Sequence, residues 1–106
     1  IIAVEPAASP IISGGDPGQH SIPGIGPNFL PPLLDLNSID SVIQVTEQQA
    51  ITMTTKLAKE EGLLVGVSSG ANVFAAIKTG LALGINKRVL TIAPDRGDRY
   101  LDFAIQ

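Results

Sequence analysis

The stretch Glu60-Glu61-Gly62-Leu63-Leu64-Val65-Gly66-Val67-Ser68-Ser69-Gly70-Ala71 decides the fold class. Gly62 stands where a helix commonly ends in the left-handed conformation, so the preceding residues are predicted to be helical. The apolar run 63–67 predicts a buried strand, because a strand covered on both faces lacks polar alternation. Residues 68–70 (Ser-Ser-Gly) then turn into a second helix. A helix, a buried strand and a helix joined by short links are typical of a parallel α/β sheet.

The residues before this stretch predict a strand followed by the first helix. Residues 41–45 (Ser-Val-Ile-Gln-Val) are rich in β-branched side chains, which is typical of a strand. Thr46 with Gln49 three positions later is a capping-box pattern, in which each side chain satisfies a free amide at a helix start. We therefore expect a helix from Thr46 to Gly62.

The residues after this stretch continue the alternation. The second helix is expected to end at Gly84, and the apolar residues 88–93 predict another strand, which Pro94 ends. Residues 95–99 are predicted to form a polar loop, and 100–105 a last helical turn. The complete order indicates an α/β fold with a parallel, doubly wound sheet and flanking helices.

The first forty residues have a different character. Residues 1–4 (Ile-Ile-Ala-Val) resemble a buried strand already under way, and the chain does not start with methionine, so we expect a piece of a longer protein. Residues 5–38 hold seven of the eight prolines, which prevent regular structure, and their apolar neighbours predict a packed, irregular wall. We therefore expect a strand plus loop over 1–40 and alternating strands and helices over 41–106.

Composition excludes several classes of function. The 106 residues carry seven Lys+Arg against ten Asp+Glu, a formal net charge of −3, which argues against binding to nucleic acid or to an anionic membrane. Because the chain has no cysteine and one histidine, it holds no Cys-based zinc site and no multi-histidine metal site. No apolar stretch approaches the ~20 residues of a membrane-spanning helix, and no signal peptide is visible.

Ser68, Pro94 and Asp95 follow predicted strands, and ligands bind beyond the carboxyl ends of strands in open parallel sheets. Ser68 also opens a helix, whose free amides and partial positive charge suit an acceptor or an anion. The alternative is plain capping, because a serine at a helix start most often only caps it. Asp95 belongs to a loop of alternating charges, which is equally typical of a solvated surface with weak ion pairs.

Gly24-Ile25-Gly26 and His20 are the other candidates. A dinucleotide-binding loop needs a third glycine where Phe29 stands, so the glycines are interpreted as turns of the wall. His20 has the chemistry of a general base, but no second histidine or nearby nucleophile supports that role, which favours a surface or hydrogen-bonding histidine. No paired-carboxylate or nucleophile–base motif is visible, so no catalytic residue is assigned within the chain.

In combination, these motifs resemble the C-terminal third of the cysteine synthases (O-acetylserine sulfhydrylases), which are fold-type II pyridoxal-phosphate enzymes. The likeness rests on five motifs: Glu5-Pro6-Ala7-Ala8-Ser9-Pro10, Ser13-Gly14-Gly15-Asp16-Pro17-Gly18-Gln19-His20, Gly24-Ile25-Gly26, the stretch 60–71, and Pro94 to Leu101. Their order and spacing cover almost the whole chain. The resemblance implies that residues 1–106 are the C-terminal portion of the large, cofactor-binding domain.

The resemblance also implies a role for each candidate. Ser68 matches the serine that hydrogen-bonds the pyridine nitrogen of the cofactor, pyridoxal 5'-phosphate, and Pro94 and Asp95 match the loop beside the ring. Gly24, Ile25 and Gly26 match the wall of the substrate cleft. His20 matches a position at the cleft mouth, where serine acetyltransferase can dock its C-terminal tail. A small hydroxylated residue is usual at Asp95, so the direction of its carboxylate matters for the cofactor.

Two kinds of difference separate the chain from its family. Ser21-Ile22-Pro23 stands where Lys-Ile-Gln is usual, and Pro27-Asn28-Phe29 where Ala-Gly-Phe is usual. Both changes stiffen the cleft wall and bear on substrate choice and partner docking. The family's Schiff-base lysine, its substrate loop and its phosphate loop all precede the matched region, so this chain alone is predicted to be inactive.

For the complete enzyme the resemblance implies conversion of O-acetylserine and sulfide to cysteine and acetate, in a cytoplasmic homodimer that includes the N-terminal portion. Cystathionine β-synthase, β-cyanoalanine synthase and S-sulfocysteine synthase share these motifs and are alternatives. The missing lysine motivates a second class, a non-catalytic homologue that acts as an interaction module. A small autonomous α/β domain is the third, but the long apolar loop has few helices to cover it.

Overall fold

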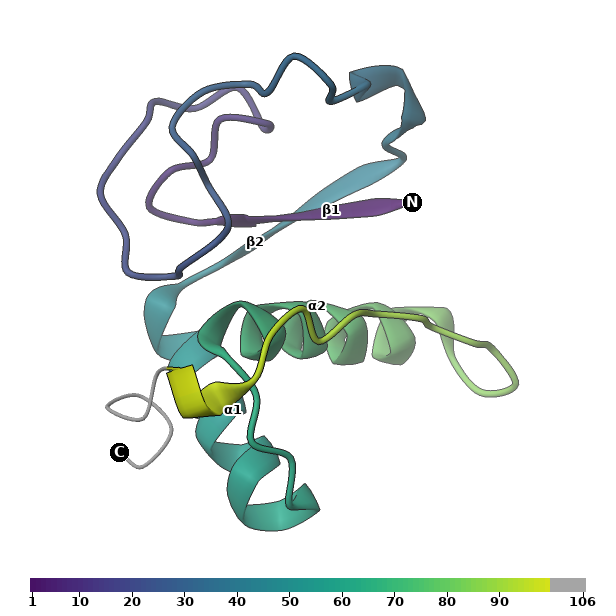
Figure 1. Cartoon of the computed structure of the whole chain (residues 1–106). Coiled ribbons are helices and arrows are strands. Elements are labelled where there is room, and N and C mark those ends of the chain that lie inside the picture. The colour runs from purple at the N-terminus through teal and green to yellow at the C-terminus, as the bar shows by residue number, and fades with distance from the viewer. Residues whose placement is uncertain (100–106) are drawn as a thin grey trace.

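The computed structural model describes residues 1–99, and its framework is a pair of parallel strands with two helices (Figure 1). β1 (Ile2–Pro6) pairs with β2 (Ser41–Val45) along their whole lengths. α1 (Glu47–Glu61) and α2 (Val67–Leu83) follow, and in Figure 1 the strand pair lies between these helices and the loop 7–40. The parallel α/β architecture predicted from the sequence is therefore confirmed.

The loop between the strands is irregular, as its prolines predict, apart from a 3-10 turn at Leu36–Ser38. It is organised around the carboxylate of Glu5, which is only 2% exposed. The Glu5 oxygens accept hydrogen bonds from the amides of Ile12 (2.8 Å) and Ser13 (3.0 Å) and from the Ser13 hydroxyl (2.5 Å). A buried carboxylate with several donors holds the first turns of the loop against the end of β1.

The predicted helix ends are confirmed. The Thr46 hydroxyl accepts from the Gln49 amide (3.1 Å), and the Gln49 side chain accepts from the Thr46 amide (2.9 Å), which completes the capping box of α1. Gly62 ends α1 with φ of +68°, in the left-handed region that glycine adopts without strain. Gly84 ends α2 with φ of +88°.

The two helices cross at Gly70, where α2 has no room for a side chain. A Cβ atom on Gly70 would lie 2.1 Å from Thr54 Oγ1 and 2.4 Å from the Ala50 carbonyl oxygen, both on α1. Thr54 is itself buried and donates its hydroxyl to the Ala50 carbonyl (2.8 Å). This close contact fixes where the first turn of α2 lies relative to α1.

Two of the predicted strands are wrong. Residues 63–67 contribute a single antiparallel bridge, Val65 to Arg96, and α2 already begins at Val67. Residues 88–93 run as an extended chain without a strand partner among residues 1–99. The apolar patterns of both segments were recognised. A strand, however, also needs a neighbouring strand that pairs with its backbone amides and carbonyls, and residues 1–99 offer no such strand to either segment. The helical turn predicted at 100–105 lies outside the described residues.

The core is small and lies between β2 and the two helices. Its buried apolar residues are Ile22, Val45, Ala50, Val67, Ala71 and Ala75. Large apolar side chains are exposed elsewhere, for example Leu81 (80%), Leu90 (94%) and Ile92 (68%). Apolar surface of this extent typically marks a place where another polypeptide packs. Within the described residues, no helix is long and apolar enough to cross a membrane.

Candidate functional site

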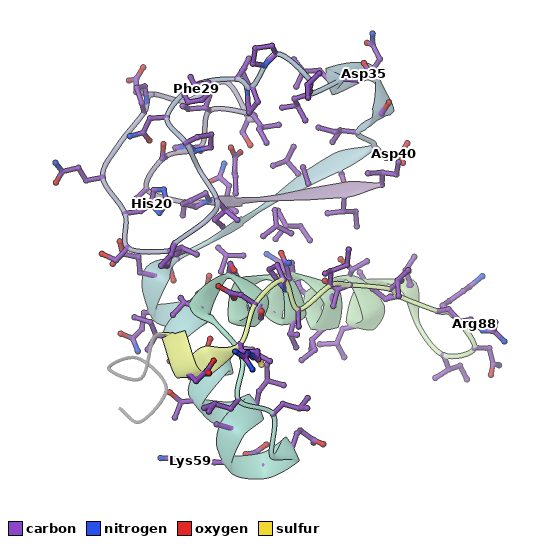
Figure 2. All side chains as sticks on the ribbon, viewed as in Figure 1. His20, Phe29, Asp35, Asp40, Lys59 and Arg88 are labelled. Atoms are coloured by element: carbon purple, nitrogen blue, oxygen red, sulfur yellow. The ribbon has the colours of Figure 1, made fainter. Side chains whose placement is uncertain are left out.

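The predicted site residues lie near the carboxyl ends of the strands. In Figure 1 the ends of β1 and β2, the start of α2 and the turn at Gly97–Arg99 lie on the same side of the molecule. This is the side at which an open parallel sheet binds ligands. Lys59, by contrast, lies at the far end of α1 and Arg88 at the opposite side of the molecule, away from these strand ends (Figure 2).

Ser68 lies in the first turn of α2 and is 4% exposed. Gly66, the residue before the helix, provides no side-chain cap. None of the hydrogen bonds between described residues uses the Ser68 hydroxyl, whereas the neighbouring Ser69 hydroxyl lies 3.5 Å from the carbonyl oxygen of Asp95. Within residues 1–99, the Ser68 hydroxyl therefore does not cap a backbone amide of α2.

Asp95 lies against the start of α2. Its backbone carbonyl accepts from the Gly66 amide (3.2 Å), and a Cβ atom on Gly66 would lie 2.1 Å from Asp95 Oδ1. That same oxygen is buried and has no hydrogen-bond partner among the described residues. The carboxylate thus faces the positive end of the α2 dipole beside Gly66, two residues before Ser68. Pro94 is exposed.

His20 and the Gly24-Ile25-Gly26 segment form a second cluster. His20 Nε2 lies 2.8 Å from the Gly26 carbonyl oxygen, and its Nδ1 accepts from the Ile22 amide (3.1 Å). Gly24 and Gly26 have φ of +88° and +62°, as turns of the wall require. The structure therefore joins His20 to the glycine segment as a hydrogen-bonding histidine, one of the two roles that the sequence favoured.

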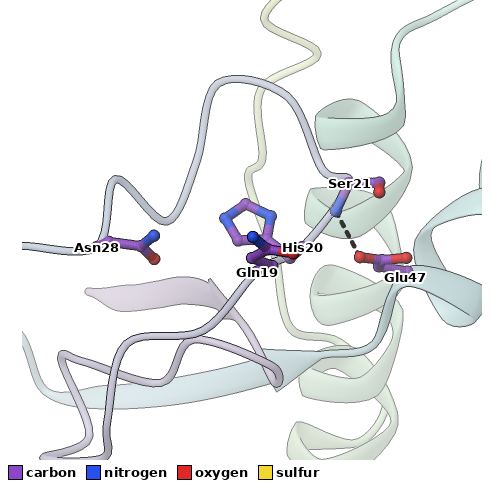
Figure 3. A pocket seen from close by; sticks show the side chains of 5 residues that line it. All are labelled: Gln19, His20, Ser21, Asn28 and Glu47. Atoms are coloured by element: carbon purple, nitrogen blue, oxygen red, sulfur yellow. Dashed lines mark hydrogen bonds between the residues drawn. The ribbon is translucent and has the colours of Figure 1, made fainter.

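A polar recess of about 500 Å³ opens beside His20 (Figure 3). Its lining residues are Gln19, His20, Ser21, Asn28 and Glu47. The Glu47 carboxylate accepts from the Ser21 amide, which ties the loop to the first turn of α1. Ser68 and Asp95 do not line this recess, so the predicted site residues fall into two groups. In the sequence, Ile22 stands between His20 and Gly24, and Val67 directly precedes Ser68. Both residues belong to the same buried core, which therefore connects the two groups.

Sequence reasoning missed the residues that shape the wall from within. Ser9 is 1% exposed; its hydroxyl donates to the Asn28 side chain (2.6 Å) and accepts from the Gly18 amide (3.2 Å). Glu5 was recognised as part of a motif but not as the anchor of the loop. A glutamate directly after an apolar strand was the available signal, because an acid in that position is buried only when donors surround it.

Comparison with known proteins places this arrangement in a family. Residues 1–95 match the family described as pyridoxal-phosphate dependent enzymes. The chain belongs to this family. It is 48% identical to a cysteine synthase of Staphylococcus aureus over 101 residues, which are 95% of this chain and 33% of that protein. The chain therefore spans about a third of the length of the curated relatives it matches.

Solved structures of this family have the same fold. A cysteine synthase from Entamoeba histolytica matches with a TM-score of 0.90 and 36% identity, over 95% of this chain and 30% of that one. An O-acetylserine dependent cystathionine beta-synthase from Helicobacter pylori matches with a TM-score of 0.85 and 48% identity, over 95% of this chain and 33% of that one. The fold-type II assignment is therefore confirmed.

The residues of this pyridoxal-phosphate dependent family member fit the cofactor's ring nitrogen. That nitrogen is a hydrogen-bond acceptor when it is unprotonated, and Ser68, which is 4% exposed, carries a hydroxyl donor that none of the hydrogen bonds between residues 1–99 uses. The chemistry of the start of α2 thus suits the neutral ring, as the resemblance implies for Ser68.

Proposed function

We propose that the chain is the C-terminal portion of the cofactor-binding domain of a pyridoxal-phosphate dependent cysteine synthase. The complete enzyme replaces the acetate group of O-acetylserine by sulfide. The bond between the substrate's β-carbon and the acetate oxygen breaks, a bond from that carbon to sulfur forms, and cysteine and acetate leave. The observation that carries the proposal is the 48% identity to a cysteine synthase over 95% of the chain.

Pyridoxal phosphate supplies the electron withdrawal that makes such a replacement possible. The role of this chain is to bind and orient. The Ser68 hydroxyl donates a hydrogen bond to the ring nitrogen, and Pro94 and Asp95 border the ring beside it. Gly24, Ile25 and Gly26 form the wall of the substrate cleft, where the absence of side chains on the glycines lets the substrate approach the backbone.

The N-terminal portion of the enzyme is the proposed partner for the exposed apolar surface. A groove of about 300 Å³ runs along α2 between β1 and residues 88–91. β1 pairs with β2 alone among residues 1–99, so its other edge presents free backbone groups. In Figure 1 β1 and residues 88–94 both lie along α2, and these two segments run in the same direction as each other. An apolar groove with free backbone on both sides suits an added strand, which supports completion by that portion.

An activity assay on the enzyme completed with its N-terminal portion tests the proposal. With O-acetylserine as first substrate, we expect cysteine from sulfide at a higher kcat/KM than the products from cyanide, thiosulfate or homocysteine. Ser68→Ala is expected to weaken cofactor binding, measured by its absorbance on titration, while Ser41→Ala, an exposed serine of β2, serves as control. A clear preference for another acceptor would overturn the assignment to cysteine synthesis.

Cystathionine β-synthesis is the second candidate. The observation that favours it is the match to the Helicobacter pylori enzyme, whose 48% identity equals that to the Staphylococcus aureus cysteine synthase. A preference for homocysteine in the same assay would select it. β-Cyanoalanine and S-sulfocysteine synthesis would be selected by cyanide and thiosulfate in the same way.

The proposal extends to partners and location. We expect a cytoplasmic homodimer, and docking of a serine acetyltransferase tail at the recess that His20 lines. Sedimentation of the completed enzyme, with and without the acetyltransferase, checks the homodimer and the docking. A completed protein that binds neither cofactor nor substrate but still binds the acetyltransferase would instead support the non-catalytic interaction module.

A further inference from the structure

Both ring nitrogens of His20 are hydrogen-bonded to the backbone of its own loop. Nδ1 faces the Ile22 amide at 3.1 Å, and an amide N–H can only donate. Nε2 faces the Gly26 carbonyl oxygen at 2.8 Å, and a carbonyl oxygen can only accept. These two partners require a neutral ring that carries its proton on Nε2.

The two hydrogen bonds connect residues that have little freedom to move. Ile22 is 1% exposed and belongs to the core, so its amide has no water to replace the histidine. At Gly26 a Cβ atom would lie 2.6 Å from His20 Nε2 and 2.5 Å from Pro6 Cγ. His20 therefore bridges the buried start of the glycine segment and its end, which packs on Pro6.

We infer that His20 is a positioning residue whose neutral, Nε2-protonated ring holds Gly24-Ile25-Gly26 in shape, so that protonation of the ring loosens this segment. A protonated ring carries a hydrogen on Nδ1, directed at the Ile22 amide hydrogen. The buried amide then loses its acceptor, while the bond from Nε2 to the Gly26 carbonyl is kept. The segment is thus released at Ile22 and stays attached at Gly26.

The charged groups around His20 are few. Glu47, from the first turn of α1, is the titratable group that shares the recess. Glu5, from the end of β1, directs its carboxylate to Ile12 and Ser13. The remaining lining residues, Gln19, Ser21 and Asn28, are uncharged.

The effect on the cleft rests on the proposed function, but the tautomer and the hydrogen bonds do not. If the segment forms the cleft wall, acid weakens substrate binding by loosening one wall, which raises KM more than it lowers kcat. A failed assignment to cysteine synthesis would change the substrate and leave the histidine measurements as they are.

The test uses nuclear magnetic resonance on the protein at its natural length, with labelled histidine and amides. Long-range correlation of the His20 ring nitrogens with the ring hydrogens reports the tautomer. Amide hydrogen exchange, corrected for the intrinsic rate at each pH, reports protection of Ile22. From about pH 8 to about pH 5, where histidines change charge, we expect this protection to fall about two- to tenfold, the effect of one lost hydrogen bond.

Two variants separate the two bonds. In His20→Asn the side-chain oxygen can accept from the Ile22 amide, so its protection should stay and become independent of pH. In His20→Gln the side-chain amide can reach the Gly26 carbonyl but leaves Ile22 without an acceptor, so protection should be low at every pH. A ring protonated on Nδ1 at pH 8, or Ile22 protection that is equally pH-dependent in His20→Asn, would overturn the inference.

Discussion

Replacing Gly70 by alanine should destabilise the protein strongly, whereas the same replacement at Gly80 should not. Both glycines lie in α2, so the change in helix propensity is matched. A Cβ atom on Gly70 would lie within 3 Å of three atoms of α1: Thr54 Oγ1 (2.1 Å), the Ala50 carbonyl oxygen (2.4 Å) and the Thr54 amide nitrogen (2.9 Å). On Gly80 the nearest atom would be Val89 Cγ2 at an ordinary 3.8 Å.

The magnitude follows from which atoms can move. Overpacking a core costs about 1–3 kcal/mol, and because two of the three atoms near Gly70 are backbone, we expect about 3 kcal/mol. Gly80→Ala should gain about 0.5–1 kcal/mol, since glycine is a poor helix former. The propensity gain is common to both variants and cancels, so they should differ by about 3 kcal/mol in the free energy of unfolding. A loss of this size is a large part of the stability of a typical domain.

Urea denaturation followed by circular dichroism measures the difference. With a slope of about 1–3 kcal/mol per molar urea, the midpoint of Gly70→Ala should lie about 1–3 M below that of Gly80→Ala. Adding Thr54→Ala removes the hydroxyl but leaves the Ala50 carbonyl in place, so rescue should be partial. If Gly70→Ala unfolded within 0.5 kcal/mol of the unchanged protein, the close crossing of α1 and α2 would be refuted.

Three further predictions concern the helix start and the loop. Thr46→Ala removes half of the capping box of α1 and should cost about 1 kcal/mol in the same urea assay, and an unchanged midpoint would contradict the cap. Glu5→Gln keeps one side-chain oxygen and turns the other into an NH2 donor, so one of the amides of Ile12 and Ser13 loses its acceptor, at a cost of about 1.5–3 kcal/mol; limited proteolysis should then cut within residues 9–19, and equal resistance would argue against the anchor. Gly26→Ala places a side chain at φ of +62° against Pro6 and His20, so the Ile22 amide should lose protection, whereas Gly24→Ala meets open space and should show only the cost of its positive φ.

Local signals explain why the helices could be predicted from the sequence. Thr46, Gln49 and Gly62 each act within one turn of a helix end, so their effect does not depend on the rest of the fold. The strands at 63–67 and 88–93 were wrong for the opposite reason. An apolar run records burial, but a strand exists only where another backbone lies beside it, which the sequence of the run cannot specify.

The site residues also divide into those that a local sequence signal reveals and those that depend on the rest of the fold. Ser68 could be singled out because a serine between an apolar run and a helix is visible in sequence. The structure adds that no hydrogen bond between residues 1–99 uses its hydroxyl. The pairing of His20 with Ile22 and Gly26 depends on how a proline-rich loop closes, and no periodic pattern encodes that closure. The role of Glu5 was hidden because a charged side chain is rarely buried, so composition alone favours exposure.

The spacing of the two strands along the chain also sets an order of assembly. α1 and α2 are joined by residues 62–66, so their contacts form between near neighbours in sequence, whereas pairing β1 with β2 requires closure of the chain from Pro6 to Ser41. Longer closures lose more chain entropy before any contact compensates for it, and contacts that are distant in sequence form more slowly. We therefore expect the helix pair to be protected first in pulse-labelled hydrogen exchange and the strand pair last. During synthesis β1 leaves the ribosome before β2, which follows only after the whole loop has been made.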